Sequence, residues 1–141
     1  MQIRPAVPED ATVISELLAA LGYPATPAQV RERLSTLDDS DCVLLTDGGL
    51  IALHRIPRLA EGDVLTRITA LVVAPEHRSK GVGRALLRAG EGVASRWGSR
   101  LLEVSSGRRP ERDAAHAFYR AEGFEDAGTD SVRYWRRLDP E

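Results

Sequence analysis

Residues 71–87 read LVVAPEHRSKGVGRALL and contain the sharpest change of pattern in the chain. An apolar strand ends near Val73, a basic loop with two glycines follows, and an amphipathic helix begins directly after it. Unpaired N–H groups at the start of a helix, together with the helix dipole, favour a phosphate or pyrophosphate. Arg78, Lys80 and Arg84 add positive charge beside that point. The pattern therefore predicts an anion-binding turn between a central strand and a long helix.

Two common phosphate-binding loops do not fit these residues. A P-loop needs GxxxxGK[ST], and no glycine lies five residues before Gly81. A dinucleotide-binding fingerprint needs Gly or Ala three residues after its second glycine, whereas Leu86 follows Gly83 at that distance. From the loop alone, a tight strand–helix turn without any ligand explains the two glycines equally well.

Outward from this loop, hydrophobic periodicity alternates between helix and strand spacing. The expected helices occupy residues 8–21, 27–37, 81–98 and 110–122. The expected strands occupy residues 2–6, 42–46, 50–56, 64–73, 101–105, 124–126 and 131–138. The Asp-Gly-Gly run at 47–49 predicts a hairpin and so an antiparallel pair, whereas the strand–helix–strand order from 64 to 105 requires a parallel pair. We therefore predict an α/β fold with a mixed sheet.

Composition narrows the class of protein. The chain has 141 residues, of which 43% are hydrophobic, and this predicts one domain spanning residues 1–141. Its single cysteine, Cys42, excludes an internal disulfide, and His54, His77 and His116 lack the spacing of a metal site, so no metal is expected. The net charge of −2 argues against a nucleic-acid partner. Without a long apolar run or a signal peptide, we expect no membrane partner and a cytoplasmic location.

Two motifs resemble those of the GNAT superfamily of acetyl-CoA-dependent N-acetyltransferases. Residues 78–83, RSKGVG, resemble its R/Q-x-x-G-x-G/A motif, and residues 116–124, HAFYRAEGF, resemble its H-x-F-Y-x-x-x-G-F signature. The order of the predicted elements is similar to that family over essentially the whole chain. The resemblance implies a V-shaped mixed sheet of about six or seven strands flanked by about four helices. It also implies that acetyl-CoA, as co-substrate, enters the gap between two parallel strands that splay apart.

The resemblance implies a place for each part of acetyl-CoA. The pyrophosphate would bind backbone N–H groups between Ser79 and Arg84, and the pantetheine would pair with Leu71 to Val73 like an extra strand. The thioester carbonyl would accept a hydrogen bond from a backbone N–H near Leu71. Ser105 and Ser106 stand where many family members carry an asparagine that bonds pantetheine, and a serine hydroxyl could take that role. The implied cofactor-binding residues are Leu71, Val72, Val73, Arg78, Ser79, Lys80, Gly81, Val82, Gly83, Arg84, Ser105, Ser106 and Tyr119.

Two side chains are candidates for proton transfer. Tyr119 in the second motif is the candidate acid, because the departing thiolate needs a proton that a positioned phenol can supply. The alternative is a tyrosine packed beside Phe118 on a core helix face. Family members often carry a glutamate base on the strand that corresponds to residues 64–73, but this strand has no carboxylate beyond Asp63 at its start. Glu103 on the neighbouring strand is therefore the candidate base, acting directly or through water, and a water chain is an equal alternative.

These residues predict an enzyme that moves the acetyl group of acetyl-CoA to a primary amine of a small molecule or peptide. The amine would attack directly in a ternary complex. The alternative is a non-catalytic acyl-CoA-binding sensor or partner subunit, which would keep loop 78–83 and dispense with the base. We expect the acceptor between residues 8–37 and the loop 57–63. Tyr134 and Trp135 point to opposite faces of the last strand, so one of them is a candidate contact of a homodimer.

Overall fold

The computed structural model describes residues 1–105, 113–126, 134 and 136–138. The chain divides into two compact units, Met1–Ser105 and Ser106–Glu141, and each is described by itself. Among the described residues, no helix is long and apolar enough to cross a membrane.

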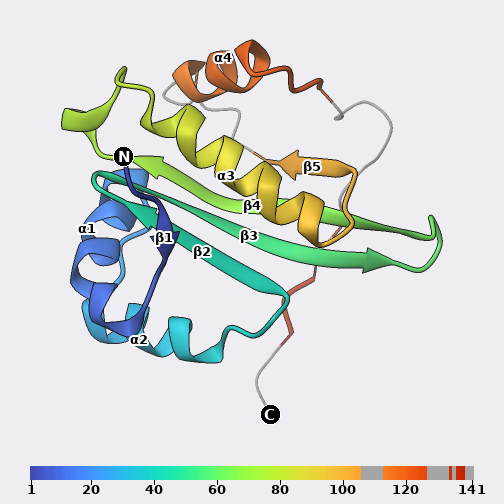
Figure 1. The fold of residues 1–141 in the computed structure, drawn as a ribbon. Coiled ribbons are helices and arrows are strands. Elements are labelled where there is room, and N and C mark those ends of the chain that lie inside the picture. Colours follow the sequence, from blue (N-terminus) through green and yellow to red (C-terminus); the bar gives the residue numbers. More distant parts are fainter. Residues whose placement is uncertain (106–112, 127–133, 135, 139–141) are drawn as a thin grey trace. The chain divides into compact units, whose positions relative to one another are not determined.

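The first unit is built on a five-stranded mixed sheet (Figure 1). Its strands, in their order across the sheet, are β1 (Arg4–Pro5), β2 (Asp41–Thr46), β3 (Gly49–Arg58), β4 (Asp63–Val73) and β5 (Leu101–Val104). Neighbouring strands are antiparallel, except that β4 and β5 are parallel. The predicted α/β fold with a mixed sheet is therefore confirmed.

The sheet has fewer strands in the described residues than the six or seven that we predicted. Residues 124–126 are described and form no strand, so that part of the prediction is wrong. The Phe124 N–H instead donates to the carbonyl of Tyr119 at 3.0 Å and closes the end of a helix. Half of the predicted last strand, 131–138, lies outside the described residues, and its described members, Tyr134 and residues 136–138, are not in a strand.

Four α-helices occur in the described residues, as predicted. They are α1 (Ala11–Leu21), α2 (Pro27–Thr36), α3 (Val82–Arg96) and α4 (Asp113–Ala121), and the 3-10 turns Pro8–Asp10 and Pro75–His77 precede α1 and α3. Local sequence determines where α1 ends and where α2 begins. Gly22 stops α1 in the left-handed region at φ 98°. Thr26 begins α2 with a capping box, in which its hydroxyl and the Gln29 side chain each accept the other residue's N–H.

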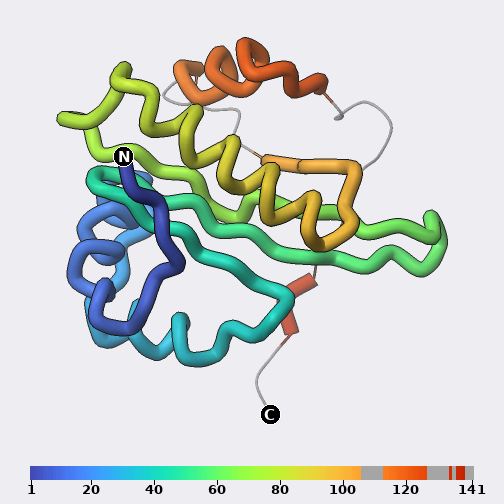
Figure 2. The backbone as a smooth tube through the Cα atoms, in the orientation of Figure 1, coloured from blue at the N-terminus to red at the C-terminus, as the bar shows by residue number. Residues whose placement is uncertain are grey.

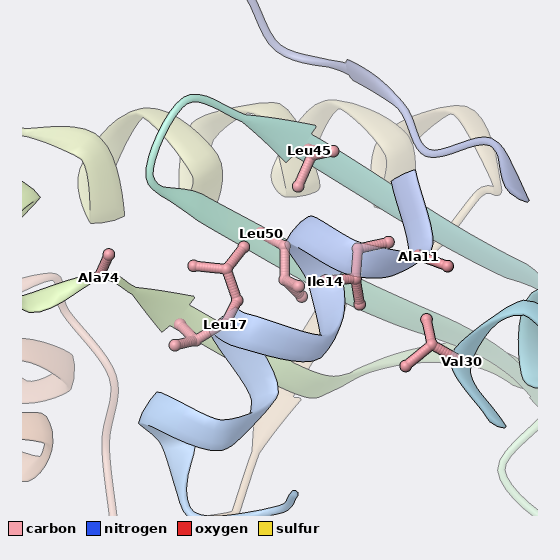
Figure 3. Close-up of a cluster of buried hydrophobic side chains, with 8 residues drawn as sticks. Ala11, Ile14, Leu17, Val30, Leu45, Leu50 and Ala74 are labelled. Atoms are coloured by element: carbon pink, nitrogen blue, oxygen red, sulfur yellow. The ribbon is translucent and has the colours of Figure 1, made fainter. Parts of the chain in front are cut away.

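The main core lies where α1 and α2 pack on one face of the sheet (Figure 3). Its buried side chains are Ala11, Ile14, Leu17, Val30, Leu45, Leu50, Val72 and Ala74. Burial of each larger aliphatic side chain contributes about 1.5–3 kcal/mol to folding. Val72 and Ala74 flank the end of β4, so this core holds the strand end from which the Gly-containing loop departs.

Helix α3 covers the opposite face of the sheet (Figure 1). Its Leu86 and Leu87 are completely buried. Gly90 lets the helix lie close to β3, because a Cβ at this position would be 3.0 Å from Cδ1 of Ile51 and 3.5 Å from Leu53. The start of α3 is thus held against the sheet by packing along the rest of the helix.

Strands β3 and β4 form a long hairpin whose turn is shorter than the predicted loop (Figure 2). We predicted a loop across residues 57–63, but β3 continues to Arg58 and β4 begins at Asp63. The two residues pair in register, and the Arg58 guanidinium donates hydrogen bonds of 2.8 and 2.7 Å to the Asp63 carboxylate. This contact lowers the pKa of Asp63. It also stabilises the last residue pair of the β3–β4 ladder, Arg58 with Asp63. Only residues 59–62 turn.

The second unit contains α4. We predicted a helix over residues 110–122, and the structure has it from Asp113 to Ala121, with residues 110–112 outside the described part of the chain. Gly123 follows it with φ 91°, as expected for a glycine that ends a helix.

Candidate active site

The sign of the backbone φ angle alternates along the Gly-containing loop. Ser79 has φ 63° and Gly81 has φ 83°, while Lys80 between them has a negative φ. Turns that alternate in this way form concave groups of N–H donors that bind anions. Ser79 pays for this conformation with steric strain, since residues other than glycine rarely adopt it.

The start of α3 adds backbone donors to this loop. The first hydrogen bond within the helix runs from the N–H of Ala85 to the carbonyl of Gly81, at 3.0 Å. The N–H groups of Val82 and Gly83 precede that bond and are among the donors that a helix leaves unpaired at its start. The helix dipole places partial positive charge at the same point.

Three cations surround the same backbone. Arg78 and Lys80 are exposed on the loop, and Arg84 is exposed on the first turn of α3. The Arg78 side chain folds back on the strand exit, where its Nε donates to the carbonyl of Val73 at 3.2 Å. The loop therefore combines the N–H donors and the positive charge that a pyrophosphate requires.

The turn between β2 and β3 supports this loop from the side (Figure 2). The carbonyl of Gly48 accepts the N–H of Ala74 at 2.7 Å, and the His77 N–H bonds the carbonyl of Ala74 at 2.9 Å. The His77 ring lies directly against Gly48, since a Cβ on Gly48 would be 2.3 Å from the ring Cγ. The sequence predicted the hairpin but not this contact, because no local pattern links the turn to a residue so far along the chain.

Strand β4 pairs with β5 over only part of its length. The parallel ladder joins residues 65–68 to residues 101–104, and β4 then continues to Val73. No strand in the described part of the chain pairs with residues 71–73 on the β5 side. This backbone edge can accept an extended ligand as an added strand.

A β-bulge coincides with the point where β4 leaves β5. In the β3–β4 ladder, Ala52 pairs with Ala70 and Leu53 pairs with Ile68, so Thr69 is the extra residue. A bulge bends its strand and increases the local twist. Because Ile68 is also the last residue of β4 that pairs with β5, the bulge accounts for the separation of the two strands beyond it.

Four polar side chains cross the sheet in one row beside this bulge. The register pairs Asp41 with His54, His54 with Arg67, and Arg67 with Glu103. Residues paired in this way point to the same face of a sheet. Asp41 and Leu45 are four residues apart on β2, so the row shares the face on which α1 packs. We call Asp41, His54, Arg67 and Glu103 the charged row.

Two close contacts hold the charged row. His54 Nδ1 lies 2.9 Å from Oδ1 of Asp41. Arg67 contacts Oε1 of Glu103 through Nε at 2.8 Å and through Nη2 at 2.7 Å. The side chains of His54, Asp41, Arg67 and Glu103 are 42%, 26%, 39% and 35% exposed. The row is thus ordered by its own contacts and remains accessible to a ligand.

Tyr119 lies in the second unit, on the buried face of α4. Its ring packs edge-on against Phe118, with centroids 5.6 Å apart, and against Phe124, with centroids 5.5 Å apart. These two ring contacts fix the position of Tyr119 within the second unit.

The remaining predicted site residues follow β5. Ser105 is exposed directly after the strand, whereas Ser106 lies outside the described residues. In the part of the chain that the structure describes, no three histidine, cysteine or acidic side chains come together as a metal site.

Comparison with known proteins gives a consistent result. The model of the acetyltransferase (GNAT) domain family matches residues 38–126. An aminoglycoside N(6')-acetyltransferase type 1 from Stenotrophomonas maltophilia is 31% identical, over 98% of this chain and 94% of that protein. A putative acetyltransferase from Arthrobacter sp. FB24 has a TM-score of 0.78 at 27% identity, covering 98% of this chain and 96% of that one. A putative acetyltransferase from Agrobacterium tumefaciens has a TM-score of 0.79 at 20% identity, covering 98% and 100%. The chain belongs to the GNAT superfamily of N-acetyltransferases.

Proposed function

We propose that the protein transfers the acetyl group of acetyl-CoA to a primary amine, by direct attack of the amine in a ternary complex. The observation that carries this proposal is the continuity of two features: the edge at residues 71–73, which no described strand pairs with on the β5 side, leads within a few residues to the anion-binding turn before α3. An extended thioester that ends in a pyrophosphate needs both features in this order. The family match also crosses from the first unit into the second, which supports residues 1–141 as one catalytic domain.

We assign the parts of acetyl-CoA to that segment. The pyrophosphate binds N–H groups between Ser79 and Arg84, and the pantetheine pairs with Leu71 to Val73. The thioester carbonyl accepts an N–H near Leu71, which lies beyond the last residue of β4 that pairs with β5. The hydroxyls of Ser105 and Ser106 contact pantetheine.

Direct attack is favoured over an acyl-cysteine intermediate. Burial raises the pKa of the Cys42 thiol, which disfavours the thiolate that such an intermediate requires. Cys42 also pairs with Leu53, a residue that packs toward α3, so it faces away from the charged row. The amine nitrogen therefore attacks the thioester carbon, the carbon–sulfur bond breaks, and Tyr119 protonates the leaving sulfur.

An acetyltransferase needs a base that deprotonates the amine, whereas an acyl-CoA-binding module does not. Glu103 is the carboxylate that we predicted for this role, and its Oε1 accepts a hydrogen bond from Nε of Arg67 and forms an ion pair with Nη2. Strand β4 carries no carboxylate after Asp63. These two facts favour the second candidate function, an acyl-CoA-binding sensor or partner subunit, whereas the family's catalytic relatives favour the enzyme.

For the acceptor we propose a polycationic amine of the aminoglycoside type. The support is the similarity to an aminoglycoside N(6')-acetyltransferase over nearly the full chain. The exposed carboxylates Asp38 and Asp39 precede β2 and would attract such a cation.

An amine panel tests this proposal directly. Purified protein is mixed with acetyl-CoA and aminoglycosides, linear polyamines or short peptides, and both CoA release and the mass of the product are measured. We expect CoA release with an aminoglycoside and a mass increase of one acetyl group. A matched compound with a hydroxyl in place of the amine controls for simple hydrolysis. Tight acetyl-CoA binding without release on any amine would favour the binding module.

A further inference from the structure

We propose that His54, oriented by Asp41, accepts the proton that the acceptor amine must lose before it attacks. This inference rests on the function proposed above and supplies the base that β4 lacks. It arises from the charged row, whose members are separated along the chain by up to 62 positions (103 − 41) and meet only through the register of four strands.

The contact between the two side chains determines which ring nitrogen is available. A carboxylate can only accept a hydrogen bond, so Nδ1 of His54 carries the proton that it donates to Asp41 at 2.9 Å. The same tautomer leaves Nε2 with its lone pair and no proton. No hydrogen bond to Nε2 occurs within the described residues, and the side chain is 42% exposed. His54 therefore offers an accessible proton acceptor that Asp41 holds in one orientation.

The position of His54 fits an approach of the amine from the α1 face. Its ladder neighbour Arg67 directly precedes Ile68, the last residue of β4 that pairs with β5. A thioester that enters where the strands separate meets the charged row at this end of the gap. Neighbouring strands are about 4.8 Å apart, so one water can bridge from Nε2 to an amine beside β4.

The charged groups around His54 are consistent with a base that becomes cationic. Asp41 on β2 is in contact and stabilises the imidazolium after proton transfer. Arg67 on β4 is the other charged neighbour in the row, and its charge is offset by Glu103 on β5. Glu103 in turn is held by a hydrogen bond from Nε of Arg67 and an ion pair with its Nη2, so we infer that it serves as the partner that orients Arg67.

The proton balance is complete with these groups. The ammonium of the acceptor gives one proton to Nε2 of His54, and the neutral amine forms the carbon–nitrogen bond with the thioester carbon. The carbon–sulfur bond breaks, and the leaving sulfur ends with the proton that the new amide nitrogen loses. The imidazolium releases its proton to water. The products are the amide, CoA with a free thiol, and one proton.

Three variants test the assignment. His54→Gln removes the base, and Asp41→Asn keeps the shape but can donate to Nδ1 and so favour the tautomer with a proton on Nε2. Arg55→Gln is the matched control, because Arg55 is the next residue of β3 and faces the other side of the sheet. General-base catalysis is typically worth about 10²–10⁴-fold, so we expect kcat/KM of His54→Gln to fall by at least about ten-fold. The kcat/KM of Asp41→Asn should also fall, and the kcat/KM of Arg55→Gln should stay near that of the wild type.

The pH profile distinguishes a base from a structural residue. An imidazole base produces a fall in kcat/KM toward acid pH, and this limb should disappear in His54→Gln while melting temperature and acetyl-CoA affinity stay near wild type. Free imidazole should restore part of the turnover of His54→Ala. Retention of the acid limb in His54→Gln, or its loss in Glu103→Gln instead, would overturn the inference. Failure of the wild type to acetylate any amine would instead refute the proposed function.

Discussion

Gly48→Ala tests whether the β2–β3 turn positions the anion-binding loop. The new Cβ would lie 2.3 Å from Cγ and 2.4 Å from Nδ1 of His77, so the ring would have to move. The φ of 80° adds a backbone cost of about 1–2 kcal/mol for alanine. Gly62→Ala is the matched control, because its φ is 70° and nothing lies within 4 Å of its Cβ. Gly62→Ala therefore loses stability only through the strained backbone conformation, without a steric clash.

The magnitudes separate the two variants. Overpacking typically costs about 1–3 kcal/mol, so Gly48→Ala should lower the free energy of unfolding by about 2–5 kcal/mol. Gly62→Ala should lower it by about 1–2 kcal/mol. For a chain of this size, 1 kcal/mol corresponds to about 3 °C, which predicts a further loss of about 3–9 °C for Gly48→Ala. Displacement of His77 also shifts the adjoining Arg78, so the Kd for acetyl-CoA should rise by about five-fold or more, equivalent to about 1 kcal/mol.

Thermal unfolding and calorimetric titration with acetyl-CoA measure both effects. The double variant Gly48→Ala/His77→Ala should recover the packing part of the loss, because the ring that clashes is gone. If Gly48→Ala and Gly62→Ala melt alike and bind acetyl-CoA as the wild type does, the β2–β3 turn does not position the loop.

Three further outcomes are expected. Gly83→Leu should abolish the rise in melting temperature that acetyl-CoA causes. The control Gly92→Leu, whose Cβ would meet only an Arg96 side-chain atom at 3.6 Å, should keep this rise. An unchanged Kd for acetyl-CoA in folded Gly83→Leu would contradict the pyrophosphate site at this loop. Tyr119→Phe removes one hydroxyl and should lower kcat by at least about ten-fold with little change in acetyl-CoA affinity, and near-normal turnover would make Tyr119 a packing residue. The hydrogen-bonded Arg4 guanidinium and a backbone N–H lower the pKa of Asp10 to about 2, so this contact stabilises the fold above about pH 4 and is lost as the pH falls toward 2. Asp10→Asn should therefore be less stable at neutral pH by about 1 kcal/mol, since solvent screens the exposed pair, and the difference in urea unfolding should vanish near pH 2.

Much of the fold could be predicted because its signals are local. Gly22 and Gly123 stop helices through their own backbone freedom, and Thr26 and Gln29 cap a helix three residues apart. The strand–loop–helix at 71–87 likewise follows from spacing within one segment. The predicted loop, 57–63, is longer than the turn in the structure, 59–62. The hydrogen bonds between the side chains of Arg58 and Asp63 extend the β3–β4 ladder, and residue propensities do not describe a contact of this kind.

The proposed base of the candidate site depends on tertiary structure. Tyr119 and the loop at 78–83 could be proposed from motifs, because each motif is contiguous. The sequence places His54 within the predicted strand 50–56, whereas its partner Asp41 and its place beside Arg67 follow from strand register, which a single sequence does not specify. The bulge at Thr69 is decided in the same way, by which residue of β3 each residue of β4 opposes. Chain-local chemistry determines where elements begin and end, whereas long-range pairing determines which side chains share a face, because each one-residue shift of register turns every side chain to the other side of the sheet.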